Sequence, residues 1–134
     1  MSSQLYTTFP HDSLQQASQK MHLKEIRHLV VLDEDQKLVG LISDRDLLRG
    51  FASNKTHSPV SEFMSWPIKT VNEQDPISKV IDIIQSNKIS ALIVLNDFNI
   101  PAGIITTDDL LLNFLDVLNK DEDLLSKLLP KFKS

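Results

Sequence analysis

The sequence predicts an α/β (α+β) fold made of two β-α-β-β-α units that form a pseudo-two-fold pair and bury one shared face. Two observations predict it. Residues 7–51 align without a gap on residues 70–114, and within each copy the apolar residues switch between helical and strand-like spacing. A long ungapped internal match indicates two copies of one supersecondary unit, and two copies are too few for a solenoid. The identical pairs are Thr7/Thr70, Asp12/Asp75, Ile26/Ile89, Leu29/Leu92, Val31/Val94, Leu32/Leu95, Gly40/Gly103, Ile42/Ile105, Asp46/Asp109, Leu47/Leu110, Leu48/Leu111 and Phe51/Phe114.

Each copy is expected to begin with a short extended segment, 6–9 or 68–72, followed by a helix. In the first copy, Asp12 and Gln15 form a candidate capping box at the start of that helix. In the second copy, Asp75 is the candidate N-cap and Pro76 the first helical residue, where a missing N–H costs nothing. Apolar residues at helical spacing follow in both copies.

Two strands and a second helix complete each copy. Residues 26–32 and 89–95 are rich in β-branched and apolar residues, and a polar turn ends each run. The turns at 33–37 and 96–99 lead into second strands at 38–43 and 102–106. Because these runs show little polar alternation, we expect helices to cover at least one full face of each sheet. The closing helices are expected to begin at Ser43 and Thr106.

The expected domain organisation is a first repeat at 1–57, a second repeat at 58–114 and a C-terminal helical extension at 115–134. Residues 50–62, "GFASNKTHSPVSE", have the composition of a linker. The leucine stripe that continues after the second repeat predicts a helix packed in a core or an interface.

Composition excludes several classes of function. The formal net charge is −4, so there is no broad basic surface for nucleic acid or an anionic membrane. There is no cysteine, the four histidines lack metal-ligand spacing, and no apolar run is long enough to span a bilayer. No signal peptide and no catalytic motif are recognisable. We therefore expect a cytoplasmic protein that is not an enzyme, with no metal and no catalytic residues.

The ordered set of motifs resembles the CBS (cystathionine-β-synthase) domain, and the pair resembles a Bateman module. In the second copy the marks are "VSEFMSWPIKTV" (60–71), "DPISKVIDII" (75–84), "ISALIVL" (89–95) and "GIITTDDLL" (103–111). In the first copy they are "DSLQQASQKM" (12–21) and "IRHLVVLDEDQKLVGLISDRDLL" (26–48), and the resemblance covers 6–114. It implies two units packed through their sheets, clefts between them for adenosine-type ligands, and a homodimer.

The resemblance also implies roles for individual residues. In the family motif Gly-apolar-apolar-[Ser/Thr]-x-x-Asp, the hydroxyl contacts phosphate and the Asp accepts from ribose. These roles fall on Ser43 and Asp46 in the first copy and on Thr106 and Asp109 in the second. The adenine slot would be formed by backbone and apolar groups at the first strand and at the start of the second strand, namely Thr7, Thr8, Arg27, His28, Thr70, Val71, Ser90 and Ala91.

The same residues have a purely structural interpretation. Ser43 with Asp46, and Thr106 with Asp109, fit helix capping boxes that contribute about 1 kcal/mol each without any ligand. A helix N-terminus also favours phosphate, and a carboxylate accepts from vicinal ribose hydroxyls. The two roles are compatible, because a cap group can exchange partners when a ligand arrives.

The two motifs differ in charge. Arg45, which suits phosphate, lies beside Asp44 in the first motif, whereas Thr107 and Asp108 occupy the second. Thr107 adds a hydroxyl, but Asp108 places negative charge where phosphate would arrive. We therefore expect the first motif to tolerate phosphate better, and the second either to prefer a less charged adenosyl ligand or to bind weakly.

These observations lead to two hypotheses for function. The first is a regulatory, energy-sensing module that binds AMP, ADP, ATP or S-adenosylmethionine, requires no cofactor, and signals to an unknown effector protein by a change of conformation or oligomer. The second is a ligand-free dimerisation or docking scaffold, favoured by the acidic residues near the phosphate position. Neither hypothesis involves nucleic acid or a membrane.

Overall fold

The computed structural model describes residues 5–112, with the side chain of Leu112 excepted. The expected C-terminal extension at 115–134 therefore lies outside the described residues. Tyr6–Ile68 forms one compact unit, the N-terminal unit, and the described residues from Lys69 to Leu112 belong to a second, the C-terminal unit. This division falls later in the chain than the expected boundary after residue 57.

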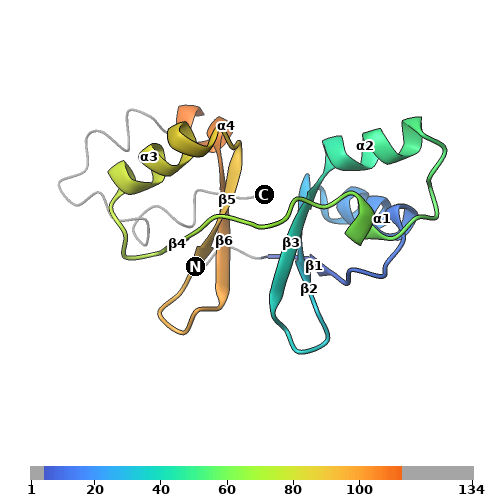
Figure 1. The fold of residues 1–134 in the computed structure, drawn as a ribbon, viewed down its shortest axis with the longest axis horizontal. Helices are drawn as coiled ribbons and strands as arrows, with labels where there is room; N and C mark the ends of the chain where they lie inside the picture. Colours follow the sequence, from blue (N-terminus) through green and yellow to red (C-terminus); the bar gives the residue numbers. More distant parts are fainter. Residues whose placement is uncertain (1–4, 113–134) are drawn as a thin grey trace. The chain divides into compact units, whose positions relative to one another are not determined.

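Both units have the predicted β-α-β-β-α order (Figure 1). The N-terminal unit contains β1 (Thr7–Thr8), α1 (Leu14–Lys24), β2 (His28–Leu32), β3 (Leu38–Ser43), α2 (Asp44–Ala52) and the short 3₁₀ helix η1 (Val60–Glu62). The C-terminal unit contains β4 (Thr70–Asn72), α3 (Ile77–Asn87), β5 (Ala91–Leu95), β6 (Pro101–Thr106) and α4 (Thr107–Leu112). In each unit the two helices lie on one face of the sheet.

The two sheets have the same topology and register. Their strand orders are β1-β2-β3 and β4-β5-β6, with the first pair parallel and the second antiparallel. Val31 lies opposite Gly40 and Val94 opposite Gly103, and the register shifts directly after each of these pairs. The predicted α/β fold of two repeated units is confirmed, and the repeat extends to the irregularities of the ladders.

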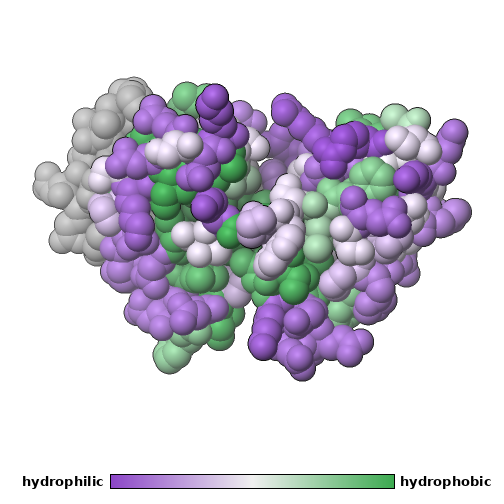
Figure 2. Space-filling view, viewed as in Figure 1, coloured by the Kyte–Doolittle hydropathy of each residue, from purple (hydrophilic) through white to green (hydrophobic). Residues whose placement is uncertain are grey.

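The hairpin turns share their geometry but not their surface chemistry. Asp33 Oδ1 accepts the backbone N–H groups of Asp35 and Lys37, and Asn96 Oδ1 accepts those of Phe98 and Ile100. Figure 2 shows a hydrophilic tip on the β2–β3 hairpin and apolar side chains at the tip of the β5–β6 hairpin. Phe98 is 83% exposed there.

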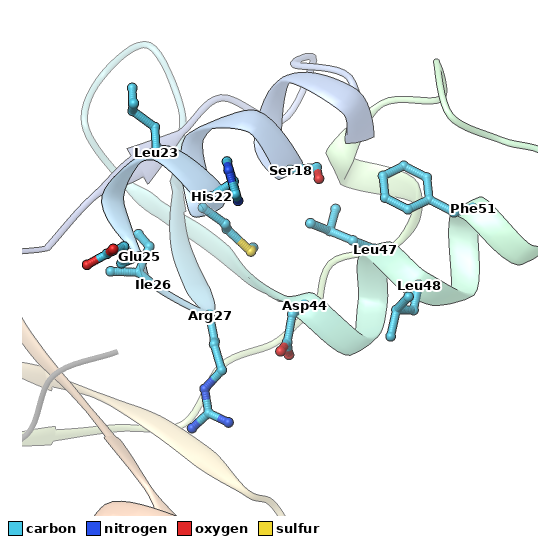
Figure 3. Close-up of a pocket in the computed structure, with 11 residues that line it drawn as sticks. Ser18, His22, Leu23, Glu25, Ile26, Arg27, Asp44, Leu47, Leu48 and Phe51 are labelled. Atoms are coloured by element: carbon cyan, nitrogen blue, oxygen red, sulfur yellow. The ribbon is translucent and has the colours of Figure 1, made fainter.

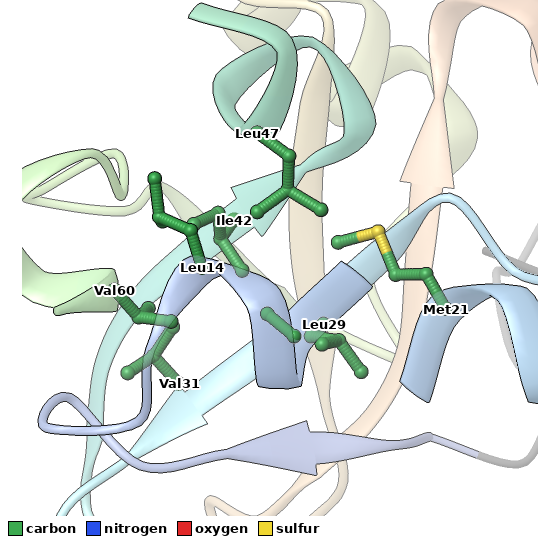
Figure 4. Packing of buried hydrophobic residues seen from close by; sticks show 8 residues of the cluster. Leu14, Met21, Leu29, Val31, Ile42, Leu47 and Val60 are labelled. Atoms are coloured by element: carbon green, nitrogen blue, oxygen red, sulfur yellow. The ribbon is translucent and has the colours of Figure 1, made fainter. Parts of the chain in front are cut away.

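Each unit has its own hydrophobic core between its sheet and helices. In the N-terminal unit the core joins α1, both long strands, α2 and η1 (Figure 4). Its buried members are Leu14, Ala17, Met21, Leu29, Val31, Ile42, Leu47 and Val60. The C-terminal core consists of Val71, Ile77, Val80, Leu92, Val94 and Ile105. These are the positions that the helical and strand spacings place on one face.

The linker prediction for residues 50–62 is wrong. Gly50 lies within α2, where a Cβ atom would meet Leu14 Cδ1 at 2.2 Å. Val60 is fully buried in the N-terminal core, and its N–H donates to the carbonyl of Asp12. Gly50 therefore permits the close packing of α1 on α2, and the polar residues after α2 form turns within the N-terminal unit.

Both predictions of the first helix cap are also wrong. The capping box of α1 is formed by Ser13 and Gln16, not by Asp12 and Gln15. The Asp12 carboxylate instead accepts from Thr8 Oγ1 at 2.7 Å and from the N–H of Phe9 at 2.8 Å. In α3 the N-cap is Pro76, in an extended conformation, and no side chain caps the helix.

Asp75 has the same structural role in the C-terminal unit as Asp12 has in the N-terminal unit. Its Oδ2 accepts the N–H of Asn72 at 2.9 Å and lies 3.0 Å from Nζ of Lys79. Each carboxylate therefore fixes the turn between the first strand and the first helix, which explains why an Asp occurs at both repeat positions without capping a helix.

These contacts predict a stability that depends on acid pH. Burial acts to raise the pKa of Asp12, but hydrogen bonds from Phe9 and Thr8 and the nearby Lys20 and His11 charges outweigh it, so the pKa lies below 3.8. The Asn72 N–H and Lys79 lower the pKa of Asp75 against a smaller effect of burial. Because both folded-state values are depressed, the stabilisation is present above about pH 5 and is lost as the pH falls through the folded-state values.

Urea denaturation of Asp12→Asn at several pH values checks this expectation. At pH 7 the variant is expected to be less stable by about 1–2 kcal/mol, because a charge-assisted acceptor is lost. The difference from the unmodified protein should shrink toward pH 3. Asp97→Asn, at an exposed turn, is the control. A difference for Asp12→Asn that stays constant with pH would contradict the role of its charge.

Candidate ligand site

The Ser43 motif forms a complete capping box at the start of α2. Ser43 Oγ accepts the N–H of Asp46 at 3.2 Å, and Asp46 Oδ2 accepts the N–H of Ser43 at 2.8 Å. The Asp46 side chain is only 12% exposed, and its Oδ1 lies 3.2 Å from Nη1 of Arg49. Both carboxylate oxygens are therefore held in fixed directions.

The Thr106 motif repeats this geometry at the start of α4. Thr106 Oγ1 accepts the N–H of Asp109 at 3.1 Å, and Asp109 Oδ2 accepts the N–H of Thr106 at 3.3 Å. The structural interpretation of both motifs is thus confirmed: each pair caps its helix.

The backbone groups at the start of α2 already have acceptors within the chain. The N–H of Asp44 donates to the carbonyl of Arg27 at 3.0 Å, and the N–H of Arg45 to Oδ1 of Asp44 at 2.8 Å. At α4 the N–H of Thr107 donates to the carbonyl of Ser90 at 2.9 Å. A phosphate at either helix would therefore have to displace an internal partner or bind through side chains.

In the N-terminal unit, the predicted adenine-slot residues lie in two places. Arg27 and His28 lie where β2 begins, beside Ser43, whereas Thr7 and Thr8 lie on β1, on the other side of β2 from β3. His28 is paired with Ser43 across β2 and β3, and Arg27 precedes it. Thr7 lies on the edge strand β1, where its carbonyl accepts from Nζ of Lys20 at 2.6 Å. Thr8 is buried, and its hydroxyl is engaged by Asp12. The Thr8 hydroxyl therefore has no proton left to donate to a ligand, and at the Thr7 carbonyl a ligand would compete with Lys20 as donor.

The C-terminal unit places the equivalent residues in the same way. Ala91 is paired with Thr106 across β5 and β6, Ser90 precedes it, and Thr70 lies on β4 opposite Ile93. Val71 belongs to the hydrophobic core, so only its backbone could serve a ligand. In both units, the start of the second strand and the capping motif lie together.

Cationic residues distinguish the first of the two motifs from the second. Four cations lie on the elements around the Ser43 motif, and none of the four has a cationic equivalent in the second copy. The pairs are Lys20/Ile83, Arg27/Ser90, Arg45/Asp108 and Arg49/Leu112. The salt bridge from Arg49 to Asp46 was not anticipated from the sequence, although their i,i+3 spacing on a helix was the available signal.

The N-terminal unit also contains a groove of about 850 Å³ between the end of α1 and α2 (Figure 3). Its lining combines charged side chains, among them Arg27 and Asp44, with the apolar side chains of Met21, Leu47 and Phe51. Ser43, Asp46, His28, Thr7 and Thr8 do not line it. The groove therefore adjoins the capping motif and shares Arg27, but not His28, Thr7 or Thr8, with the predicted adenine slot. Leu23 and Leu48 on its rim are 76% and 66% exposed.

Two kinds of feature are absent from the described part of the chain: a cluster of metal-ligating side chains and a membrane-spanning helix. Within residues 5–112 no group of three or more His, Cys, Asp or Glu side chains is placed to hold a metal ion. None of the helices described there has the length and apolar character needed to cross a bilayer.

The family model of the CBS domain matches residues 1–53 and 60–116. The chain belongs to the CBS domain family. Each match contains one of the β-α-β-β-α units and its capping motif, so the tandem CBS pair predicted from the repeat is confirmed.

Solved CBS structures have the same fold. One is the CBS domain pair of a protein in complex with 5'-methylthioadenosine and S-adenosyl-L-methionine, which is 28% identical, with a TM-score of 0.73 and coverage of 86% of this chain and 92% of that one. A second is a CBS-domain protein from Agrobacterium tumefaciens, 22% identical with a TM-score of 0.71, covering 81% of this chain and 83% of that one. The second likeness shows the fold alone.

Curated relatives differ in how much of their length this chain spans. It is 27% identical over 115 residues to an uncharacterised 17.7 kDa protein of Acidianus ambivalens, covering 86% of this chain and 70% of the relative. It is 30% identical over 104 residues to the L-aspartate semialdehyde sulfurtransferase of Methanocaldococcus jannaschii, covering 78% of this chain but 20% of that enzyme. The chain thus spans about a fifth of the length of the sulfurtransferase.

Proposed function

We propose that the CBS pair is a regulatory module that binds adenosine-containing ligands at its two strand-to-helix turns. In each unit a hydroxyl and a carboxylate are held together at the end of a strand, beside the start of the neighbouring strand. The hydroxyl would face the 5' substituent and the carboxylate would accept from the ribose. The structure that is 28% identical, with its adenosyl ligands, supports this class of ligand.

The observation that carries the proposal is the paired capping motif, present in both units with the same hydrogen bonds. A cap stabilises a helix without needing an aspartate with this orientation, since Ser13 and Gln16 form a capping box on α1 with no carboxylate. Among the described α-helices, only α2 and α4 carry an Asp at the third helical position. These two helices follow β3 and β6, the last strand of each unit.

The charged residues near the two motifs differ, so we expect each turn to prefer a different adenosyl ligand. Arg45 and Arg27, near the Ser43 motif, favour a ligand with a phosphate such as AMP, ADP or ATP. Asp108, beside the Thr106 motif, disfavours phosphate and favours a neutral or cationic adenosyl compound such as 5'-methylthioadenosine or S-adenosylmethionine. Ligand binding would then shift the conformation or the assembly of the pair, which requires different affinities for the two states.

A thermal-shift screen with AMP, ATP, S-adenosylmethionine, 5'-methylthioadenosine and GMP tests the proposal. Adenosyl ligands at about 100 times their dissociation constant should stabilise the protein by about 2.7 kcal/mol. GMP is the control for recognition of the base and should have a smaller effect. No shift with any adenosyl ligand at millimolar concentration would contradict the proposal.

The scaffold hypothesis retains one specific observation in its favour. The exposed Leu23 and Leu48 lie at a groove of mixed apolar and polar lining on the helical face of the N-terminal unit, and exposed apolar side chains of this kind are found on surfaces used for self-association. A homodimer formed through this face would be compatible with ligand binding at the turns. A protein that dimerises without responding to any adenosyl ligand would favour the scaffold alone.

A further inference from the structure

Arg49 connects two parts of the N-terminal unit through one guanidinium group. Its Nη1 lies 3.2 Å from Oδ1 of Asp46, and its Nη2 donates to the carbonyl of Phe63 at 3.2 Å. The guanidinium carbon also lies 5.9 Å from the centroid of the Phe63 ring. Because the guanidinium is planar and rigid, its hold on one partner depends on its position at the other.

Phe63 belongs to the segment 60–68, the connector, which leads to the first residue of the C-terminal unit. Backbone hydrogen bonds and core packing fix the connector. The N–H groups of Val60 and Ser61 donate to the carbonyls of Asp12 and Pro10, and Phe63 and Met64 pack against the N-terminal core. Val60 is buried in the core, the N–H of Met64 donates to Val60, and Ser65 exchanges two backbone hydrogen bonds with Leu41 of β3. Arg49 adds a side-chain contact between α2 and this segment. The equivalent position in the second copy is a leucine, Leu112.

We propose that Arg49 is a positioning residue that couples the carboxylate of Asp46 to the connector. This inference rests on the proposed function, in which Asp46 accepts from a ribose hydroxyl. Oδ2 of Asp46 accepts the N–H of Ser43, and in this proposal the ribose donates to Oδ1, the oxygen that Arg49 contacts. The ligand therefore competes with Nη1 of Arg49, loosens the guanidinium, and weakens its contact with Phe63.

A ligand-free experiment tests the coupling by amide hydrogen exchange at Met64 and Ser65, followed by NMR. Asp46→Asn and Arg49→Met should each raise these exchange rates by about three- to tenfold, because each removes one charge of a partly buried pair. The double variant should exchange no faster than the faster single variant, since both changes break the same link. The amide oxygen introduced by Asp46→Asn can still accept from the N–H of Ser43, so the cap of α2 is kept.

Lys79→Met is the matched control. It breaks the ion pair with Asp75 in the C-terminal unit and should leave exchange at Met64 and Ser65 unchanged. Equal acceleration by Lys79→Met would show general destabilisation and overturn the proposal. Unchanged exchange in Asp46→Asn, or effects that multiply in the double variant, would also overturn it.

Saturation with AMP provides the second arm. In the unmodified protein AMP should raise exchange at Met64 and Ser65 while slowing it in the core strands, and in Arg49→Met AMP should bind without this local increase. AMP that binds the unmodified protein and leaves the connector unchanged would contradict the coupling. If AMP does not bind at all, the proposed function fails at this turn, and the ligand-free variants alone decide whether Arg49 links Asp46 to Phe63.

Discussion

Replacing Leu14 by alanine is expected to lower the free energy of unfolding by about 2–5 kcal/mol, the largest stability effect among the substitutions considered. Leu14 is fully buried, at the first position of α1, in contact with the core of the N-terminal unit (Figure 4). Its Cδ1 fills the space above Gly50 of α2, where a Cβ atom would lie 2.2 Å away. The truncation therefore opens a cavity between α1 and α2.

Gly50→Ala is expected to change the free energy of unfolding in the direction opposite to the usual effect of alanine in a helix. Alanine in a helix interior is normally more stable than glycine by about 1 kcal/mol. Here the added methyl group collides with Leu14, so we expect Gly50→Ala to destabilise the protein by about 1–3 kcal/mol. Gly50→Ala introduced into Leu14→Ala should recover part of the loss, because the new methyl group enters the cavity.

Urea unfolding of the two single variants and the double variant, followed by circular dichroism, measures these effects. Ala52→Gly, at the exposed end of the same helix, serves as a control for the effect of glycine without core contacts. A Gly50→Ala protein more stable than the unmodified one would show that α1 and α2 do not pack as closely as described.

The second large effect is on ligand affinity. Asp109→Asn should lower the affinity for S-adenosylmethionine, and Asp46→Asn the affinity for AMP, each by about 10- to 100-fold. Hydrogen bonds to a charged group contribute about 1.5–3 kcal/mol, and about 1.4 kcal/mol corresponds to tenfold in affinity. Asparagine can still accept the N–H of Thr106 or Ser43, so the helix caps are preserved.

Neighbouring carboxylates provide matched controls for these two substitutions. Asp44→Asn removes a carboxylate next to the Ser43 motif without touching the proposed ribose acceptor, and Asp108→Asn does the same at the Thr106 motif. Asp108→Asn is further expected to improve the binding of phosphate-bearing ligands at the second turn, because it removes a repelling charge.

Much of this architecture is predictable from one sequence because the repeat supplies two independent copies of each signal. Apolar runs that end in Asp33 or Asn96 predict the hairpins, and the Ser43 and Thr106 motifs predict the caps of α2 and α4. The duplicated Asp12 and Asp75 were correctly identified as structurally equivalent. The predicted role of both residues as helix caps is wrong. The Asp12 carboxylate accepts from Thr8 and Phe9, and the Asp75 carboxylate accepts from Asn72, before either helix begins.

Packing across the chain explains what the sequence did not reveal. Gly50 and Val60 have a linker-like neighbourhood, and only the tertiary contact with Leu14 and the N-terminal core shows that both positions are part of a folded unit. The contact of Arg49 with Phe63 joins residues far apart on the chain, for which local spacing gives no signal. The expected roles of the eight adenine-slot residues remain predictions.

Isothermal titration calorimetry of AMP and of S-adenosylmethionine against the unmodified protein, Asp46→Asn and Asp109→Asn tests whether the two turns are separate adenosyl sites. We predict that AMP affinity falls in Asp46→Asn and stays within about twofold in Asp109→Asn, with the reverse for S-adenosylmethionine, since each carboxylate would serve one ligand. Equal loss of AMP affinity in both variants would contradict the division between the turns. If neither ligand gives a measurable heat of binding with the unmodified protein, adenosyl binding itself is contradicted.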